Sequence, residues 1–126
     1  MLDPVIHQAT RLRIMAALFR NREASFTHLR DGLDLTDGNL GSHAAALEKA
    51  GYLASRRALS GLSFEVRYRI TPQGSAAFVA YTQALRALLH DALPEEQEEA
   101  RDRGEKRQDQ GDGGRGLAQA DRPLRL

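Results

Sequence analysis

The residues best suited to bind a partner are four arginines that flank a short Ser60-Gly61 turn. They are Arg56, Arg57, Arg67 and Arg69. Guanidinium groups form charge-assisted hydrogen bonds to phosphates and enter narrow minor grooves of DNA. Arginine on the solvent face of an exposed hairpin also protects its edge from pairing with other chains. Because only Glu65 opposes the four charges in this stretch, the cluster favours contact with DNA.

The sequence does not indicate catalytic chemistry. It lacks a Ser/His/Asp grouping, a paired-carboxylate pocket, a Gly-rich phosphate loop and an HExxH motif. The histidines are scattered at His7, His28, His43 and His90, with no ligand-like pair at i, i+4, although a site assembled between subunits stays open. Cysteine is absent, which excludes disulfides and thiolate ligands. We therefore expect no enzyme, no cofactor and no metal.

A helix is predicted over residues 36–50. Thr36 is a good N-cap, because its hydroxyl can accept from a free backbone N–H two or three residues on. Leu40, Ala44 and Leu47 form one apolar stripe that faces a core. The opposite face carries only small residues, namely Gly38, Gly41, Ser42 and Ala45. The backbone of this helix can therefore lie close to a partner, as in the recognition helix of a helix-turn-helix, and Gly51 ends it.

The elements before this helix must hold it in place. A first helix is expected over residues 3–20, with Asp3 as its cap and Pro4 in its first turn. Ser25-Phe26 suggests a very short strand, and a second helix follows over 28–33 with Thr27 as its N-cap. Asp34 stands at a turn position where the backbone often adopts the left-handed conformation and where Gly is the usual residue.

The elements after it form a hairpin and a last helix. In residues 52–70 the apolar side chains of Phe64, Val66, Tyr68 and Ile70 alternate with charged ones, which predicts a strand of a two-stranded hairpin. We call this hairpin the wing. Thr71-Pro72 then starts a helix that runs to about residue 93.

Composition divides the 126 residues at Pro94. Residues 1–93 carry 11 basic and 8 acidic residues, a net charge of +3, and are expected to form one domain. Residues 94–126 carry 7 basic and 9 acidic residues, are rich in Gly and hold almost no large apolar residues. We expect this tail to be disordered, because it cannot bury enough apolar surface to offset its ordering entropy.

Two segments together indicate a family. LTDGNLGSHAAALEKAGYL, followed by a hairpin that ends VRYRITPQGSAAF, resembles the small winged helix-turn-helix transcriptional regulators of the MarR and ArsR groups, over about residues 5–90. The resemblance implies a mainly α fold with a small β-hairpin: four helices plus a two-stranded wing. It also implies a homodimer that binds palindromic double-stranded DNA, with helix 36–50 in the major groove and wing 52–70 on the backbone or in the minor groove.

Carried over residue by residue, the resemblance places Gly38, Asn39, Gly41 and Ser42 nearest the bases, after Thr36 at the helix start. Asn39 is the best candidate for direct base contact, because an asparagine amide can bond an adenine edge through two hydrogen bonds. The alternative, which the sequence slightly favours, is an ordinary polar residue of a first helical turn. His43 is expected to pack or touch phosphate. Three departures from the family pattern weaken the expected affinity for DNA: Asp37, which opposes phosphates, the run Ala44 to Ala46, and Asp34.

Two apolar faces on the first helix, and a long stripe on the last, suggest a dimer interface. Its expected residues are Ile6, Leu12, Phe78, Tyr81, Leu85, Leu88 and Leu89. The first helix could instead be buried on both sides within one domain.

The alternative function is a winged-helix module that binds proteins and not DNA. No apolar run approaches the length of a membrane span and no signal peptide is visible, so we expect a cytoplasmic protein, whose effector, if any, the sequence does not reveal.

Overall fold

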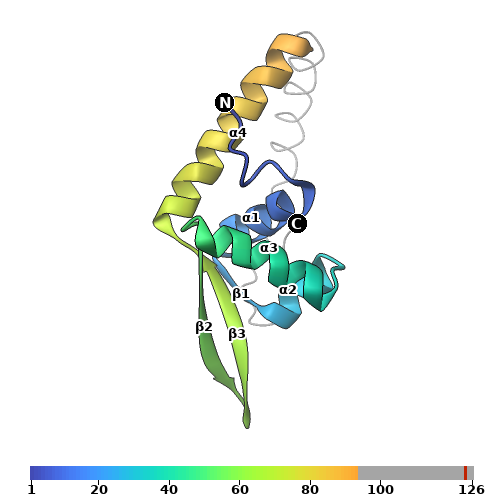
Figure 1. Cartoon of the computed structure of the whole chain (residues 1–126), viewed down its shortest axis with the longest axis vertical. Coiled ribbons are helices and arrows are strands. Elements are labelled where there is room, and N and C mark those ends of the chain that lie inside the picture. The colour runs from blue at the N-terminus through green and yellow to red at the C-terminus, as the bar shows by residue number, and fades with distance from the viewer. Residues whose placement is uncertain (94–123, 125–126) are drawn as a thin grey trace, which may run out of the picture. The chain divides into compact units, whose positions relative to one another are not determined.

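The computed structural model describes residues 1–93 and 124, so the predicted disorder of the tail lies outside the described residues. Contacts divide the described residues into two units, residues 1–82 with 124, and residues 83–93. In order, the elements are α1 (Ala9–Asn21), β1 (Glu23–Ser25), α2 (Phe26–Gly32), α3 (Asp37–Lys49), β2 (Leu53–Ser60), β3 (Ser63–Ile70) and α4 (Pro72–Ala92), labelled in Figure 1. This order is that of a winged helix.

The first helix begins later than predicted. Asp3 does not cap it: its Oδ1 accepts from the Val5 backbone N–H at 2.8 Å, which closes a separate turn. Gln8 is extended, and its side chain caps α1 by accepting from the Arg11 backbone N–H at 2.7 Å. This break lets Ile6 turn inward, where it is fully buried.

The predicted turn between the second and third helices is confirmed, whereas the start of the second helix is corrected. Ser25 caps α2 in place of Thr27, its hydroxyl accepting from the His28 backbone N–H at 3.0 Å. Asp34 adopts a positive φ of 56°, as the sequence suggested. Thr36 then caps α3 by accepting from the Asn39 backbone N–H at 3.1 Å, and Gly51 leaves the helix with a φ of 84°.

The sheet has three strands, namely the two strands of the predicted wing and the short strand expected before the second helix. Its order is β1-β3-β2, and both pairings are antiparallel. The short strand expected at Ser25-Phe26 lies at Glu23–Ser25, where it pairs with the base of β3. β2 and β3 continue past the helices as the wing (Figure 1).

The core lies where α1, α2 and α3 meet. Its largest fully buried side chains come from the three helices, from the segment before α1 and from the residue that follows α2: Ile6, Ile14, Met15, Leu18, Leu29, Leu33, Leu40 and Leu47. Each such side chain stabilises the fold by about 1.5–3 kcal/mol relative to exposure. The stripe predicted for residues 36–50 thus faces the core and leaves the other side of α3 outward.

The start of α4 is fastened to the end of α3. Thr71 caps α4 as predicted, its hydroxyl accepting from the Gly74 backbone N–H at 2.9 Å and donating to the Gly51 carbonyl at 2.7 Å. A Cβ on Gly74 would lie 2.2 Å from the Tyr52 carbonyl oxygen. Only glycine allows the two segments to approach this closely.

Candidate nucleic-acid interface

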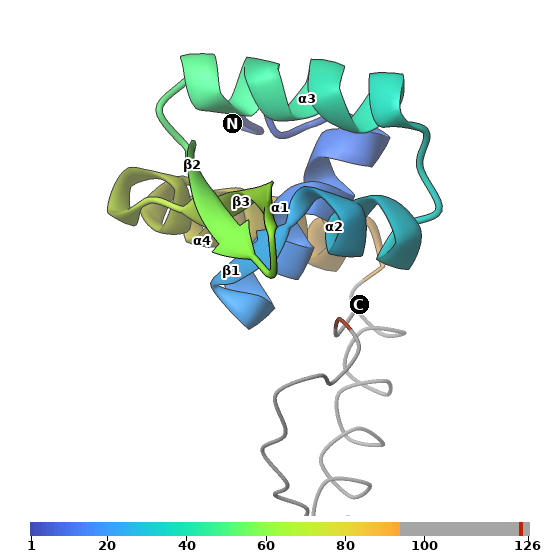
Figure 2. The same ribbon diagram turned by 90° about the horizontal axis from the view of Figure 1, so that it is seen from below.

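The outward face of α3 is the first component of the site. Thr36, Gly38, Asn39 and Ser42 are exposed, and Gly41 and His43 are half-buried, so all six predicted residues of this helix reach the surface. In Figure 2 α3 lies on one side of the strands, and its outer surface is uncovered by any other described element. A helix exposed in this way can enter a major groove.

The two glycines of α3 are not required by the backbone or by packing in the described part of the chain. Neither has a positive φ, and a Cβ on Gly38 or Gly41 would meet nothing within 4 Å. A glycine inside a helix destabilises it by roughly 0.5–1 kcal/mol relative to alanine. Neither backbone conformation nor packing among the described residues therefore requires glycine at these two positions.

Asp37 is paired, which the sequence did not indicate. Arg30, from α2, donates from Nη1 to Asp37 Oδ1 at 2.8 Å and from Nε to Asp31 Oδ1 at 2.9 Å. Its two acidic partners raise the pKa of Arg30 above its ordinary value. Because Arg30 is shared between Asp31 and Asp37, the three side chains keep a net charge of −1, and the start of α3 still opposes phosphates.

His43 is held by a residue of α1 that sequence reasoning missed. Arg11 donates from Nη1 to His43 Nδ1 at 3.3 Å and from Nε to the Val5 carbonyl at 2.6 Å. A neutral His43 whose Nδ1 accepts this bond carries its proton on Nε2, as a donor for an external acceptor. No local signal connects positions 11 and 43, because the helices meet only in the folded chain.

Two of the four wing arginines are held by a carboxylate that the sequence did not connect to them. Arg56 Nη2 and Arg67 Nε both lie 2.6 Å from Glu23 Oε1, and Arg67 Nη1 lies 2.8 Å from Glu65 Oε2. The expectation that only Glu65 opposes the cluster was wrong, because β1 brings Glu23 to the wing. Hydrogen bonds from Arg67 and Arg56 lower the pKa of Glu23, despite some desolvation. With two acids beside them, Arg56 and Arg67 add no net charge.

The four arginines also divide between the two faces of the wing. Arg56 is opposite Arg67, and Arg69 is opposite Ala54, so these three arginines share one face with Glu23. Arg57 is opposite Val66 and shares the other face with Tyr68, which is buried. Arg69 lies at the base of the wing and lines a surface pocket with Phe19, Arg22 and Glu23. The predicted joint contact of all four arginines with one partner is therefore not supported by their placement.

The residues predicted at a dimer interface differ in exposure. Ile6 is 0% and Tyr81 2% exposed, so both pack inside this chain and are unavailable to a second subunit. A hydrogen bond of 2.9 Å joins Tyr81 to His7, and Phe78 stacks on Phe19 with ring centroids 5.0 Å apart. Leu12, Phe78 and Leu85 are half-buried, whereas Leu88 and Leu89, in the later half of α4, are exposed.

Metal and membrane sites were also sought within the described residues. Residues 1–93 and 124 contain no group of three His, Cys, Asp or Glu side chains placed to hold a metal ion. Among the same residues, no helix combines the length and apolar character needed to span a bilayer.

Comparison with known proteins identifies the family. The winged helix DNA-binding domain family matches residues 10–89, and the chain belongs to it. A Methanocaldococcus jannaschii protein described as uncharacterized is 30% identical over 77 residues, which cover 61% of this chain and 84% of that protein. The predicted winged helix-turn-helix class is thereby confirmed.

Solved structures agree with this assignment. The transcriptional regulator homologue from Pyrococcus horikoshii OT3 matches with a TM-score of 0.68 and 28% identity, over 71% of this chain and 88% of that chain. The YusO protein from Bacillus subtilis shares the fold, with a TM-score of 0.61 and 16% identity over 87% and 77% of the two chains. The protein is a DNA-binding transcriptional regulator of the winged-helix type, and family and fold point to a non-enzymatic role.

Proposed function

We propose that the protein regulates transcription as a homodimer that binds double-stranded DNA sequence-specifically, with α3 in the major groove and the wing on the backbone or in the minor groove. The observation that carries this proposal is the outward face of α3, where Gly38 and Gly41 have open space around them. A groove-bound helix with small outward side chains brings its backbone and its few polar groups close to the base edges.

The polar groups on this face define what the helix would read. The Asn39 side chain is exposed, and the Thr36 cap uses only its backbone N–H, so its amide is free to pair with an adenine edge. Ser42 is exposed one turn further along the helix and can donate to a base or a phosphate. His43 offers Nε2 to a phosphate while Arg11 holds Nδ1.

The dimer is supported by exposed apolar residues of α4. Leu88 is 54% and Leu89 41% exposed, and Leu93, directly after the helix, is 48% exposed. Three large apolar side chains on a short stretch are a surface that a second copy of the same helix would cover. A two-fold dimer would place its two α3 helices about 34 Å apart, which is one turn of DNA. Acting on DNA, such a regulator would work in the cytoplasm.

Selection of bound sequences from random duplexes tests the proposed function. The expected result is a palindromic site with two half-sites one helical turn apart, bound with an affinity that falls steeply with salt. Binding that competitor DNA abolishes, with no enriched sequence, would contradict the proposal and favour a module that binds proteins.

A further inference from the structure

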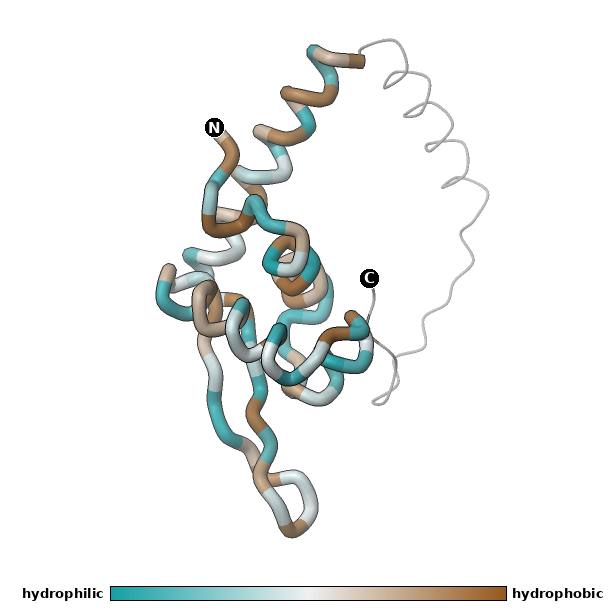
Figure 3. The backbone as a smooth tube through the Cα atoms, turned by 45° about the vertical axis from the view of Figure 1, so that its right-hand side comes forward, coloured by the Kyte–Doolittle hydropathy of each residue, from teal (hydrophilic) through white to brown (hydrophobic). Residues whose placement is uncertain are grey.

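The face of the wing opposite Glu23 is apolar and exposed. Apart from Tyr68, its only ionisable residue is Arg57, and we call the set Arg57, Leu59, Phe64 and Val66, with Leu62 in the turn, the apolar wing face. Leu59 is 72%, Phe64 62% and Leu62 107% exposed. Figure 3 shows the tip of the wing coloured as hydrophobic. Nothing in the described part of the chain covers these side chains, and an exposed patch of this kind marks an interaction surface.

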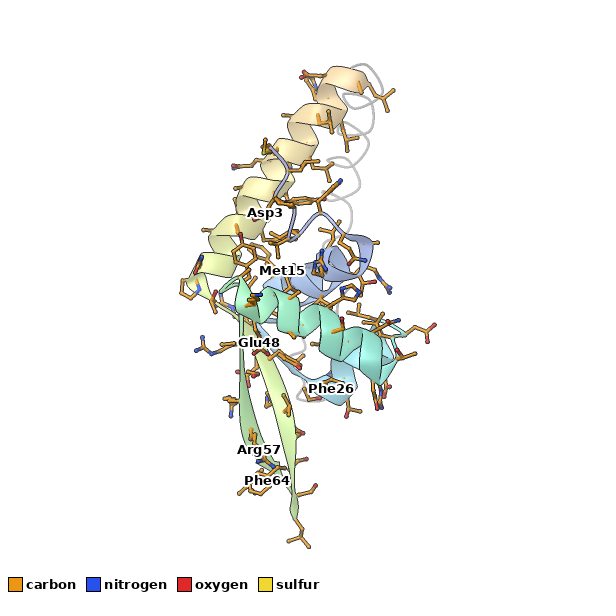
Figure 4. All side chains as sticks on the ribbon, in the orientation of Figure 1. Asp3, Met15, Phe26, Glu48, Arg57 and Phe64 are labelled. Carbon is orange, nitrogen blue, oxygen red and sulfur yellow. The ribbon has the colours of Figure 1, made fainter. Side chains whose placement is uncertain are left out.

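Arg57 is held on this face by an aromatic ring. Its guanidinium carbon lies 5.1 Å from the centroid of the Phe64 ring, a cation–π contact. Figure 4 shows the two side chains together on the projecting part of the wing. Neither Glu23 nor Glu65 reaches this side, because both lie on the opposite face of the sheet. Among the described residues, no carboxylate on this face therefore offsets the charge of Arg57, whereas Glu23 and Glu65 offset the charges of Arg56 and Arg67.

The apolar wing face points to the same side of the sheet as α3. Towards the base of the wing this face continues into Tyr68, whose ring lies 6.3 Å from that of Phe26 in α2 and whose pKa is raised by burial and by Glu48 of α3. Leu53, on the same face, is also buried. The face that the helices cover at the base is uncovered beyond them, on the side of the strands where α3 lies (Figure 2).

We infer that the protein contacts the minor groove of DNA through the apolar wing face, with Arg57 as its only charged contact, and that the arginine face of the wing points away from the duplex. This inference rests on the proposed function and assigns the wing contact within it. Minor-groove proteins combine Arg in the negative potential of the groove with Leu or Phe against its floor and walls. The position of this face on the same side of the sheet as α3 favours DNA as the occupant over a protein surface.

Two neighbouring arginines provide the matched test. Arg57→Gln and Arg56→Gln remove the same charge from adjacent positions on opposite faces. Using the DNA site selected by the wild-type protein, Arg57→Gln should weaken binding about fivefold at physiological salt and reduce the salt slope by about 1. Arg56→Gln should leave both unchanged. Equal losses in the two variants, or a loss only in Arg56→Gln, would overturn the inference.

The groove and the apolar contact are tested on the same site. Replacing flanking A·T pairs by I·C pairs keeps the minor-groove edge, whereas G·C pairs add the guanine amino group there. We expect I·C flanks to retain affinity, G·C flanks to lower it, and Leu62→Ser with Phe64→Ser to lower it at least fivefold. Full DNA affinity of the serine variant would overturn the inference and point to a protein partner. Absence of sequence-specific binding by the wild-type protein would instead contradict the proposed function.

Discussion

Arg56 and Arg67 share a single oxygen of Glu23, each at 2.6 Å, and this relationship joins all three strands of the sheet. Arg56 lies on β2, Arg67 on the central strand β3 and Glu23 on β1. The carboxylate therefore fixes β1, the base of the wing and β2 at once. We assign Arg56 and Arg67 to holding the wing, and not to binding DNA.

Glu23→Gln should destabilise the fold in a way that depends on pH. The pKa of Glu23 is lowered in the folded chain, so its ion pairs stabilise the fold above the unfolded pKa of about 4.3. This contribution is lost as the pH falls through the lower, folded pKa. We expect Glu23→Gln to lower the free energy of unfolding by about 1 kcal/mol at pH 7, because the group is partly exposed.

Urea unfolding of both proteins at pH 7 and at pH 2 measures this effect. The difference between them should be smaller at pH 2 than at pH 7, because protonation of Glu23 removes its ion pairs as the pH falls through its folded pKa. A difference of the same size at both pH values would mean that the glutamate acts through its shape and not through its charge.

Gly74→Ala should destabilise the domain without touching the DNA-binding surface. The added methyl carbon would lie 2.2 Å from the Tyr52 carbonyl oxygen, so the backbone of α4 or of the loop must move. Overpacking of this kind costs typically 1–3 kcal/mol. Thermal unfolding measures the loss, and Ala76→Gly, at an exposed position of the same helix, is the control for helix propensity. An unchanged Tm in Gly74→Ala would refute the close contact.

Gly41→Ala should have opposite effects on folding and on binding. Since a Cβ there meets nothing within 4 Å, alanine should stabilise α3 by roughly 0.5–1 kcal/mol. The same methyl group should hold the helix away from the base edges and weaken DNA binding. Chemical denaturation and titration with the selected duplex measure the two effects. Unchanged affinity with raised stability would show that DNA does not approach this position closely.

Asn39→Ala should relax sequence preference at one position of each half-site. The side chain of Asn39 is exposed, so its loss should leave stability nearly unchanged. Loss of a bidentate contact to adenine should cost about 1–3 kcal/mol on the preferred site and little on a site with that base pair changed. Binding titrations on both duplexes measure this difference. An equal loss on both would make Asn39 a phosphate contact.

Leu88→Glu with Leu89→Glu should produce monomers. Both side chains are exposed in the later half of α4, so the substitution should not disturb the core of residues 1–82. Like charges placed at a two-fold interface repel each other across the axis. Sedimentation at micromolar concentration should show a dimer for the wild-type protein and a monomer for the variant. A wild-type monomer would contradict the dimer, and a dimeric variant would place the interface elsewhere.

Local signals in the sequence predicted α3 and its two ends well. The Thr36 cap, the positive φ of Asp34 and the end of the helix at Gly51 follow from side-chain and backbone preferences of single residues. The apolar stripe of Leu40, Ala44 and Leu47 follows from helical spacing. These features depend on neighbours within a few positions, which is why one sequence sufficed to place them.

Features that depend on tertiary register were missed. Glu23 lies 44 positions before Arg67, and a strand of three residues gives almost no periodic signal. The alternation of Phe64, Val66 and Tyr68 predicted the two faces of β3, but not that the helices cover the apolar face only at its base, where Tyr68 is buried and Phe64 is not. Arg11 was likewise not connected to His43. In each case the partner is brought near only by the packing of separate elements.

The close contact at Gly74 couples the movement of α4 to that of α3 at one point. Thr71 binds the Gly51 carbonyl, and no side chain separates the backbone of Gly74 from that of Tyr52. A tilt at the beginning of α4 is therefore passed directly to the C-terminal end of α3. We therefore expect that a partner which tilts the start of α4 also changes the angle at which α3 meets DNA.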